Sequence, residues 1–169
     1  MRALGIDPGL VHTGWAVVEP AGPRAVVLGH GVIAPPTTSE LPARLADGAR
    51  KLRDVVAQFQ PTIVALEEIF TAPRHPKSAL LMAHMRGVIC LVIAEAGIPI
   101  IPLTATTVKQ RLTTSGHASK EQVQRMVLRI AGLDVSTRLR LDETDAIALA
   151  LAALHQSSHP LAALAMKAR

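Results

Sequence analysis

Four acidic residues border apolar runs of this chain and limit how those runs can fold; they are Asp7, Glu67, Asp142 and Asp145. Asp7 follows the run over residues 3–6, Glu67 follows the run over 63–66, and Asp145, with Asp142 three positions earlier, precedes the run over 146–154. Apolar runs become core, and an ionised carboxylate at the edge of a core is costly unless a positive charge compensates it. No lysine or arginine directly neighbours Asp7 or Glu67. A divalent metal, which prefers oxygen ligands, is the simplest compensating charge.

The chain is 169 residues long and 49% hydrophobic, which suits one domain with a sizeable core. Its positive charge is concentrated in one region, because residues 74–140 contain ten lysines and arginines but only three acids. A basic half beside an acidic constellation indicates an anionic polymer held over a metal site. A solvated basic surface is the alternative explanation of the charge.

The single cysteine, Cys90, lies in an apolar run and is expected to be a buried small hydrophobe. No apolar stretch approaches the roughly 20 residues of a membrane span, and Asp7 and Pro8 interrupt the N-terminal run, so no signal peptide is indicated. We therefore expect a cytoplasmic protein with no membrane partner.

Alternation of strand-like and helix-like patterns predicts the architecture. Strands are expected over residues 2–6, 13–19, 24–34, 62–67 and 98–103. Helices are expected from Ser39 to Pro61 and over residues 77–96, 104–112, 119–130 and 142–156. This order predicts an α/β fold in which a mixed five-stranded sheet has helices on both faces. Residues 1–157 form a single expected domain, and residues 158–169 a C-terminal tail.

The four acids are expected to meet at one end of the sheet. Asp7 and Glu67 end strands whose carboxyl ends point the same way, where parallel sheets bind ligands. Asp142 and Asp145 are three positions apart and lie on one face of a helix at its first turn. Four converging carboxylates match two-metal phosphodiester chemistry, for which two Mg²⁺ ions per site fit best, with Mn²⁺ as a substitute.

Each acid also has a purely structural explanation. Asp7 with Pro8 and Gly9 is a good turn former, and Asp142 with Asp145 would stabilise a helix N-terminus. Glu67 is harder to explain in this way, because either it or Glu68 must face a covered side of the sheet.

Five ordered motifs resemble the signatures of the bacterial RuvC family of crossover junction endodeoxyribonucleases. They lie at residues 4–9 with 13–15, 65–70, 108–110, 118–124 and 142–150. The resemblance covers nearly the whole chain. It implies an RNase H-like fold, a homodimer, and metal-dependent symmetric nicking of four-way junction DNA, together with branch-migration partners of the RuvA and RuvB type.

The resemblance also implies roles for single residues. Asp7, Glu67, Asp142 and Asp145 match the family's catalytic metal-binding acids, whereas Glu68 matches no catalytic position. Phe70 matches an aromatic residue that contacts bases, and Lys109 and Lys120 match basic residues near the DNA. Arg74 and Lys77, from charge and position, are expected to contact phosphates. The segment Thr114–His117 departs from the family, which has a Gly-rich turn with an arginine there.

Three alternatives remain open at this point. The chain could be a junction-binding protein without catalysis, or an RNase H-like nuclease that cuts RNA in a hybrid. A phosphotransferase of the actin and sugar-kinase type is disfavoured, because one domain of this length cannot supply both lobes. The helix over residues 77–96 is apolar on nearly every side, which indicates burial either in the core or against another subunit.

Overall fold

The computed structural model describes residues 1–22, 24–68, 76–134 and 137–157, with the side chains of residues 76–78, 156 and 157 left out. One five-stranded sheet has the order β3-β2-β1-β4-β5. Its strands are β1 (Ala3–Asp7), β2 (Thr13–Ala21), β3 (Arg24–Ile33), β4 (Ile63–Glu67) and β5 (Ile100–Leu103). The first three strands pair antiparallel, and β4 pairs parallel with both β1 and β5. The predicted order of strands and helices and the mixed sheet are confirmed.

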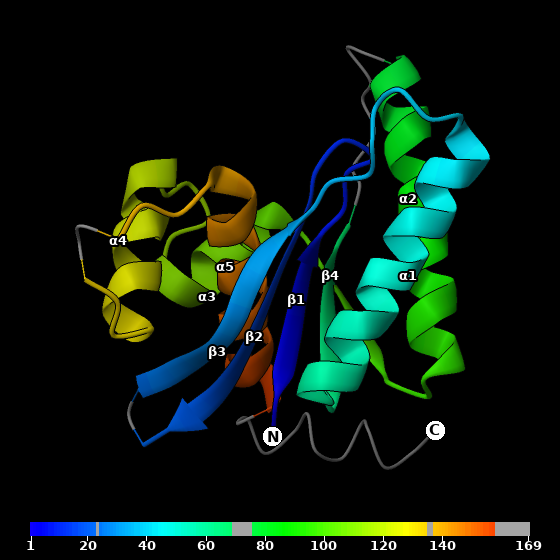
Figure 1. The fold of residues 1–169 in the computed structure, drawn as a ribbon. Helices are drawn as coiled ribbons and strands as arrows, with labels where there is room; N and C mark the ends of the chain where they lie inside the picture. Colours follow the sequence, from blue (N-terminus) through cyan, green and yellow to red (C-terminus); the bar gives the residue numbers. More distant parts are fainter. Residues whose placement is uncertain (23, 69–75, 135–136, 158–169) are drawn as a thin grey trace.

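In the described part of the chain, five helices cover the two faces of this sheet (Figure 1). On one face lie α1 (Leu41–Phe59) and α2 (Pro76–Glu95); on the other lie α3 (Ala105–Thr113), α4 (Lys120–Ile130) and α5 (Leu141–Ser157). Helix α5 packs directly on β1, β2 and β4, and α3 and α4 pack against α5. Within the described residues, no helix has the length and apolarity needed to cross a membrane.

The alternation of side chains along the central strands divides the core into two layers. Ala3, Ile63 and Ala65 point to the layer that contains α5, whereas Leu4 and Leu66 point to the layer of α1 and α2. Because side chains alternate along a strand, Asp7 and Glu67 continue the first set. Both acids therefore lie on the side of the sheet that α5 covers.

The prediction that Ser39 opens α1 is wrong, and burial of α2 in the core is confirmed for one side of that helix. Ser39 does not open α1, because its N-cap is Glu40, followed by Leu41 and by Pro42 in the first turn. Helix α2 is not buried all round: Met85 and Ile89 are in the core, but Leu80 is 61% and Leu91 is 57% exposed. A single helix packed on one sheet face can bury only one side, so the apolar residues of its other side face outward in the monomer.

Candidate active site

Asp7 and Glu67 end two neighbouring parallel strands at the same edge of the sheet. Strands β1 and β4 are paired in register from Ala3 opposite Ile63 to Ile6 opposite Leu66, and each acid is the next residue. Both residues are half-buried. Strand order alone therefore brings together two side chains that are 60 positions apart in the sequence.

The first turn of α5 brings Asp142 and Asp145 to the same edge. Gly14 is paired with Asp7 in the β1–β2 ladder, and a Cβ atom at Gly14 would collide with the main-chain carbonyl of Asp142. One turn further along, a Cβ at Gly5 would collide with the carbonyl of Ala146. Helix α5 thus lies backbone to backbone on β1 and β2. This close approach sets its acidic first turn beside the ends of the strands.

Electrostatic coupling shows that the acids act on one another. Burial, a hydrogen bond with Glu67 and the negative charges of Glu67, Asp145 and Asp142 raise the pKa of Asp7 to about 8. Two carboxyl groups can share a hydrogen bond only if one of them is protonated, and the raised pKa makes Asp7 the donor at neutral pH. Without a counter-charge, this site therefore retains a proton.

Two lysines lie beside the acids. Lys109 on α3 and Lys120 on α4 line a cavity of about 200 Å³ together with Glu67 and Asp145. Burial raises the pKa of Asp145, Lys120 and Lys109 lower it, and Glu67 and Asp142 raise it, so that the net shift is upward. The lysines thus offset only part of the cost of gathering the acids.

The donor set fits divalent metal ions, although it is not closed around one. Among the described ion pairs, none includes Asp7, Glu67, Asp142 or Asp145. A concentration of carboxylate oxygen with raised pKa values is what a dication compensates. Within the described residues, however, no three His, Cys, Asp or Glu side chains are arranged to hold a metal ion as they stand.

The remaining candidate DNA-binding residues cannot be compared with this geometry. Phe70 and Arg74 lie outside the described residues. Lys77 lies in the first turn of α2, but its side chain is outside the described set. Their predicted contacts with DNA stay predictions.

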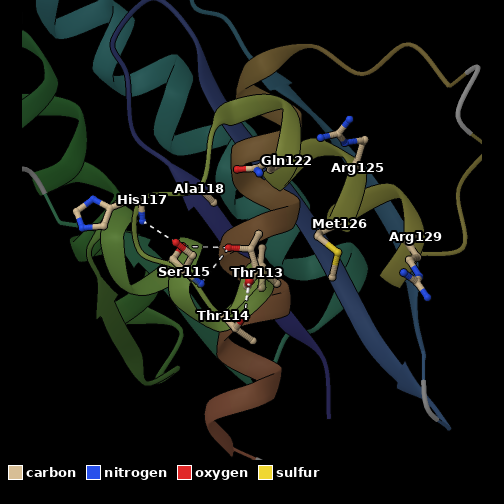
Figure 2. Close-up of a pocket in the computed structure, with 10 residues that line it drawn as sticks. Thr113, Thr114, Ser115, His117, Ala118, Gln122, Arg125, Met126 and Arg129 are labelled. Carbon is tan, nitrogen blue, oxygen red and sulfur yellow. Dashed lines mark hydrogen bonds between the residues drawn. The ribbon is translucent and has the colours of Figure 1, made fainter.

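The segment Thr114–His117, which departs from the family pattern, forms the turn between α3 and α4. It lines a groove of about 650 Å³ whose other wall is the outer face of α4, with Arg125, Met126 and Arg129 (Figure 2). The turn is held internally: the Thr113 hydroxyl donates to the Ser115 carbonyl at 3.0 Å, and the His117 amide donates to Ser115 Oγ at 3.3 Å. Lys120 and Arg129 are nine positions apart, so they lie on opposite sides of α4. The groove thus lies on the side of α4 opposite to Lys120, which lines the acidic cavity.

One contact beside the acids was missed from the sequence. Glu143, between the two acids of α5, lies 2.8 Å from His30 Nδ1 on β3 and accepts a hydrogen bond from the Arg140 amide at 2.8 Å. Burial raises the pKa of Glu143, but the hydrogen bonds from Arg140 and His30 outweigh it and bring the pKa below its usual value. Glu143 follows Arg140 by three residues, which is the spacing of a capping box. His30 carries no comparable sequence signal.

Comparison with known proteins gives the same picture across the chain. The family model described as crossover junction endodeoxyribonuclease RuvC matches residues 3–153. A protein of that name from Syntrophomonas wolfei is 39% identical over 155 residues, covering 92% of this chain and 89% of the relative. The solved structure of Thermus thermophilus RuvC superposes with a TM-score of 0.85 at 32% identity, covering 94% of this chain and 96% of that one. The same protein in complex with a Holliday junction substrate gives 0.86, also at 32% identity, covering 93% and 94%.

The sheet order, the covering helices and the acidic strand ends together define an RNase H-like nuclease fold. Yeast mitochondrial Holliday junction resolvase, at 14% identity and a TM-score of 0.67, shares this fold. The family match extends over far more than half of the chain. The chain belongs to the RuvC family.

Proposed function

We propose that this protein is an endonuclease that resolves Holliday junctions by metal-dependent, symmetric nicking of two opposed DNA strands. The observation that carries the proposal is the gathering of four carboxyl groups, which raises the pKa of Asp7 to about 8. Membership of a family of crossover junction endodeoxyribonucleases indicates that the substrate is junction DNA. A relative that is 32% identical has been solved with a Holliday junction substrate.

Nucleases of the RuvC family are metal-dependent, and we propose two Mg²⁺ ions per site, with Mn²⁺ as a substitute. Asp7 and Glu67 would be the central ligands, and Asp142 and Asp145 would complete the two sites. When bound, such ions activate water and stabilise the leaving oxygen of an in-line displacement at phosphorus. Mg²⁺ suits this site because it needs few carboxylates and completes its shell with water and phosphate oxygens.

The residues of the chain itself would do the remaining work. Asp7 would release its proton when the negative charge around it is compensated, because that charge is one cause of its high pKa. Lys120 and Lys109, on the wall of the cavity next to Asp145, would hold the scissile phosphate over the acids. Phe70 would stack on an unpaired base, and Arg74 and Lys77 would bind phosphates of the junction arms.

We further propose a homodimer in which α2 contributes to the interface. Leu80, Leu81 and Leu91 are exposed on this helix, and burial of such residues against a second subunit would remove apolar surface from water. Two symmetric cuts need two sites in a fixed relation, which a two-fold dimer provides. We place this dimer in the cytoplasm, with branch-migration proteins of the RuvA and RuvB type as partners and residues 1–157 as its single nuclease domain.

A cleavage assay tests the proposed function. The full chain is incubated with a synthetic four-way junction, a matched linear duplex and an RNA/DNA hybrid, in Mg²⁺, Mn²⁺ or EDTA, with Asp7→Asn in parallel. We expect paired nicks in the junction alone, only with metal, and a loss of at least about 100-fold in the variant, the order seen when a group central to transition-state stabilisation is removed. Junction binding without cutting in either metal would instead indicate a binding module, and cutting of the hybrid would indicate a ribonuclease.

A further inference from the structure

We propose that Glu143, held by His30, is a positioning residue that fixes the rotation of the first turn of α5 and so aims Asp142 and Asp145 at Asp7 and Glu67. This inference rests on the proposed function, because it concerns the same metal-binding acids. It adds two residues to that site, neither of which would touch the metal or the DNA.

The contacts of Glu143 connect two parts of the fold. One carboxylate oxygen lies 2.8 Å from Nδ1 of His30, and the other accepts a hydrogen bond from the Arg140 amide at 2.8 Å. The Glu143 side chain is only 13% exposed, although it belongs to a charged residue in the first turn of a helix. Since an ionised carboxylate can only accept, His30 donates from Nδ1. Glu143 therefore ties the start of α5 to strand β3 with both of its oxygens in use.

His30 provides an anchor on the sheet. It lies in the edge strand β3, opposite Ala16 of β2, and β2 in turn pairs with β1 on its other side. The tie thus runs from α5 to the same sheet that carries Asp7. A hydrogen bond to a loop would leave the first turn of α5 free to move with that loop, whereas the hydrogen bond to His30 attaches this turn to the sheet.

The position of Glu143 on the helix explains what the tie controls. Successive residues are about 100° apart around a helix axis, so Glu143 points well away from both Asp142 and Asp145. Contact of Gly14 with the Asp142 carbonyl fixes how close the first turn of α5 lies to the sheet, and packing from Ala146 onward holds the body of the helix, but neither contact holds the side of the first turn on which Glu143 lies. The contacts of Glu143 with His30 and Arg140 attach the first turn on that side as well. Outer residues that orient metal ligands typically change metal affinity by about 10–100-fold when they are removed.

Mn²⁺ binding, followed by the electron paramagnetic resonance signal of the free ion, tests this in the full-length protein without any reaction. We expect Glu143→Ala and His30→Ala each to weaken Mn²⁺ binding about tenfold. His30→Ala keeps every carboxylate, so its effect cannot arise from lost negative charge. Glu143→Gln loses the charge but keeps an oxygen acceptor, and we expect it to retain most of the affinity. The double variant, with alanine at both positions, should bind Mn²⁺ no more weakly than the weaker-binding single variant, because the two substitutions remove the same hydrogen bond.

Glu95→Ala is the matched control. It removes one acid and one interhelical ion pair, Glu95 with Arg53 at 3.0 Å, far from α5 in the sequence, and should leave Mn²⁺ binding unchanged. Hydrogen exchange in the metal-free protein gives a second readout. The Thr144 amide, which donates to the Arg140 carbonyl at 3.0 Å, should exchange about tenfold faster in Glu143→Ala and His30→Ala but not in the control, since local opening governs its exchange.

Wild-type affinity retained by both alanine variants would overturn the inference, as would equal losses in Glu143→Gln and Glu143→Ala with none in His30→Ala, which would assign the effect to charge. A wild-type protein that binds no Mn²⁺ and cuts no junction would overturn the proposed function itself. The exchange rates would then decide the positioning role separately: unchanged Thr144 exchange in both variants would refute it.

Discussion

Gly14 of β2 lies directly against the main-chain carbonyl of Asp142 on α5, with no room for a Cβ atom between them. Gly14 is also the ladder partner of Asp7. One glycine therefore connects an acid at the end of a central strand with an acid at the start of the covering helix. This relationship makes the geometry of the site depend on a residue that carries no chemistry of its own.

Gly14→Ala should damage both stability and metal binding. The added methyl group must push α5 away from the sheet, and overpacking of this kind costs about 1–3 kcal/mol of the free energy of unfolding. Urea unfolding measures this loss, and Mn²⁺ titration measures the expected drop in affinity. Ala46→Ser, at an exposed position of α1, adds one atom to the surface and should change stability by less than about 0.5 kcal/mol. Equal behaviour of the two variants would show that α5 can move at no cost.

The raised pKa of Asp7 gives the metal-free protein a particular pH dependence. Asp7 titrates near its ordinary value of 3.8 when unfolded but at about 8 when folded. Between these values the folded state holds a proton that the unfolded state lacks, so this contribution to stability is complete at low pH and is lost as pH rises through 8. The Asp7→Asn variant has no carboxyl group at this position, so its stability does not change with pH for this reason. In EDTA, the stability of the wild type should therefore fall relative to Asp7→Asn between pH 5 and 8, by up to about 1.4 kcal/mol per pH unit.

Urea unfolding of both proteins at pH 5, 6, 7 and 8 measures that difference. With saturating Mg²⁺ the wild type should be the more stable of the two proteins, because only the wild type gains from binding a ligand to its folded state. Stability curves that run parallel in EDTA would show that Asp7 ionises normally.

Removal of the Lys120 charge should shift the pH range over which the site binds metal. Lys120 lowers the pKa of Asp145 against the effect of burial, so Lys120→Met should raise that pKa further. Metal ligands must be deprotonated, and Mn²⁺ affinity should therefore fall more at pH 6 than at pH 8. Lys120→Arg keeps a positive charge and serves as the control. A uniform loss at both pH values would point to a role for Lys120 other than tuning Asp145.

The proposed dimer makes α2 sensitive to charge. Leu91→Glu places a carboxylate on a side chain that is 57% exposed in the monomer, so the fold should tolerate it while an apolar interface would not. Sedimentation at micromolar concentration should show a dimer for the wild type and a monomer for the variant. Val26→Glu, at a residue of β3 that is 45% exposed, is the control and should stay dimeric. A dimeric Leu91→Glu would exclude Leu91 from the interface.

Much of the fold and the placement of two acids follow from local sequence. Side-chain alternation puts Ala65 and Glu67 on one strand face and Leu66 on the other, and the structure has this arrangement. Strand β5 begins at Ile100 rather than at Ile98, because the amide of Ile98 still closes the end of α2 by donating to the Ile93 carbonyl. Local periodicity is enough where each element packs in one way against its neighbours.

Other features depend on distant partners and could not be predicted in this way. His30 and Glu143 are 113 positions apart, and nothing near either residue indicates the other. Gly14 precedes Trp15 in a strand, where a glycine weakens β-structure and signals close backbone approach without saying to what. The burial of α2 was likewise indeterminate, since its sequence is apolar on several sides and packing alone decides which side faces the core.

Helix α5 rests on β1 and β2 through main-chain atoms at Gly5 and Gly14, and this has a consequence for motion. A contact between side chains adjusts when a rotamer changes, whereas a contact between two backbones has no torsion through which to yield. We therefore expect fluctuations in the rest of the core to be poorly transmitted to the gap between the strand ends and the helix start. The side chains of the acids on either side of that gap can rotate individually, but we expect the distance between their Cα atoms to stay nearly constant.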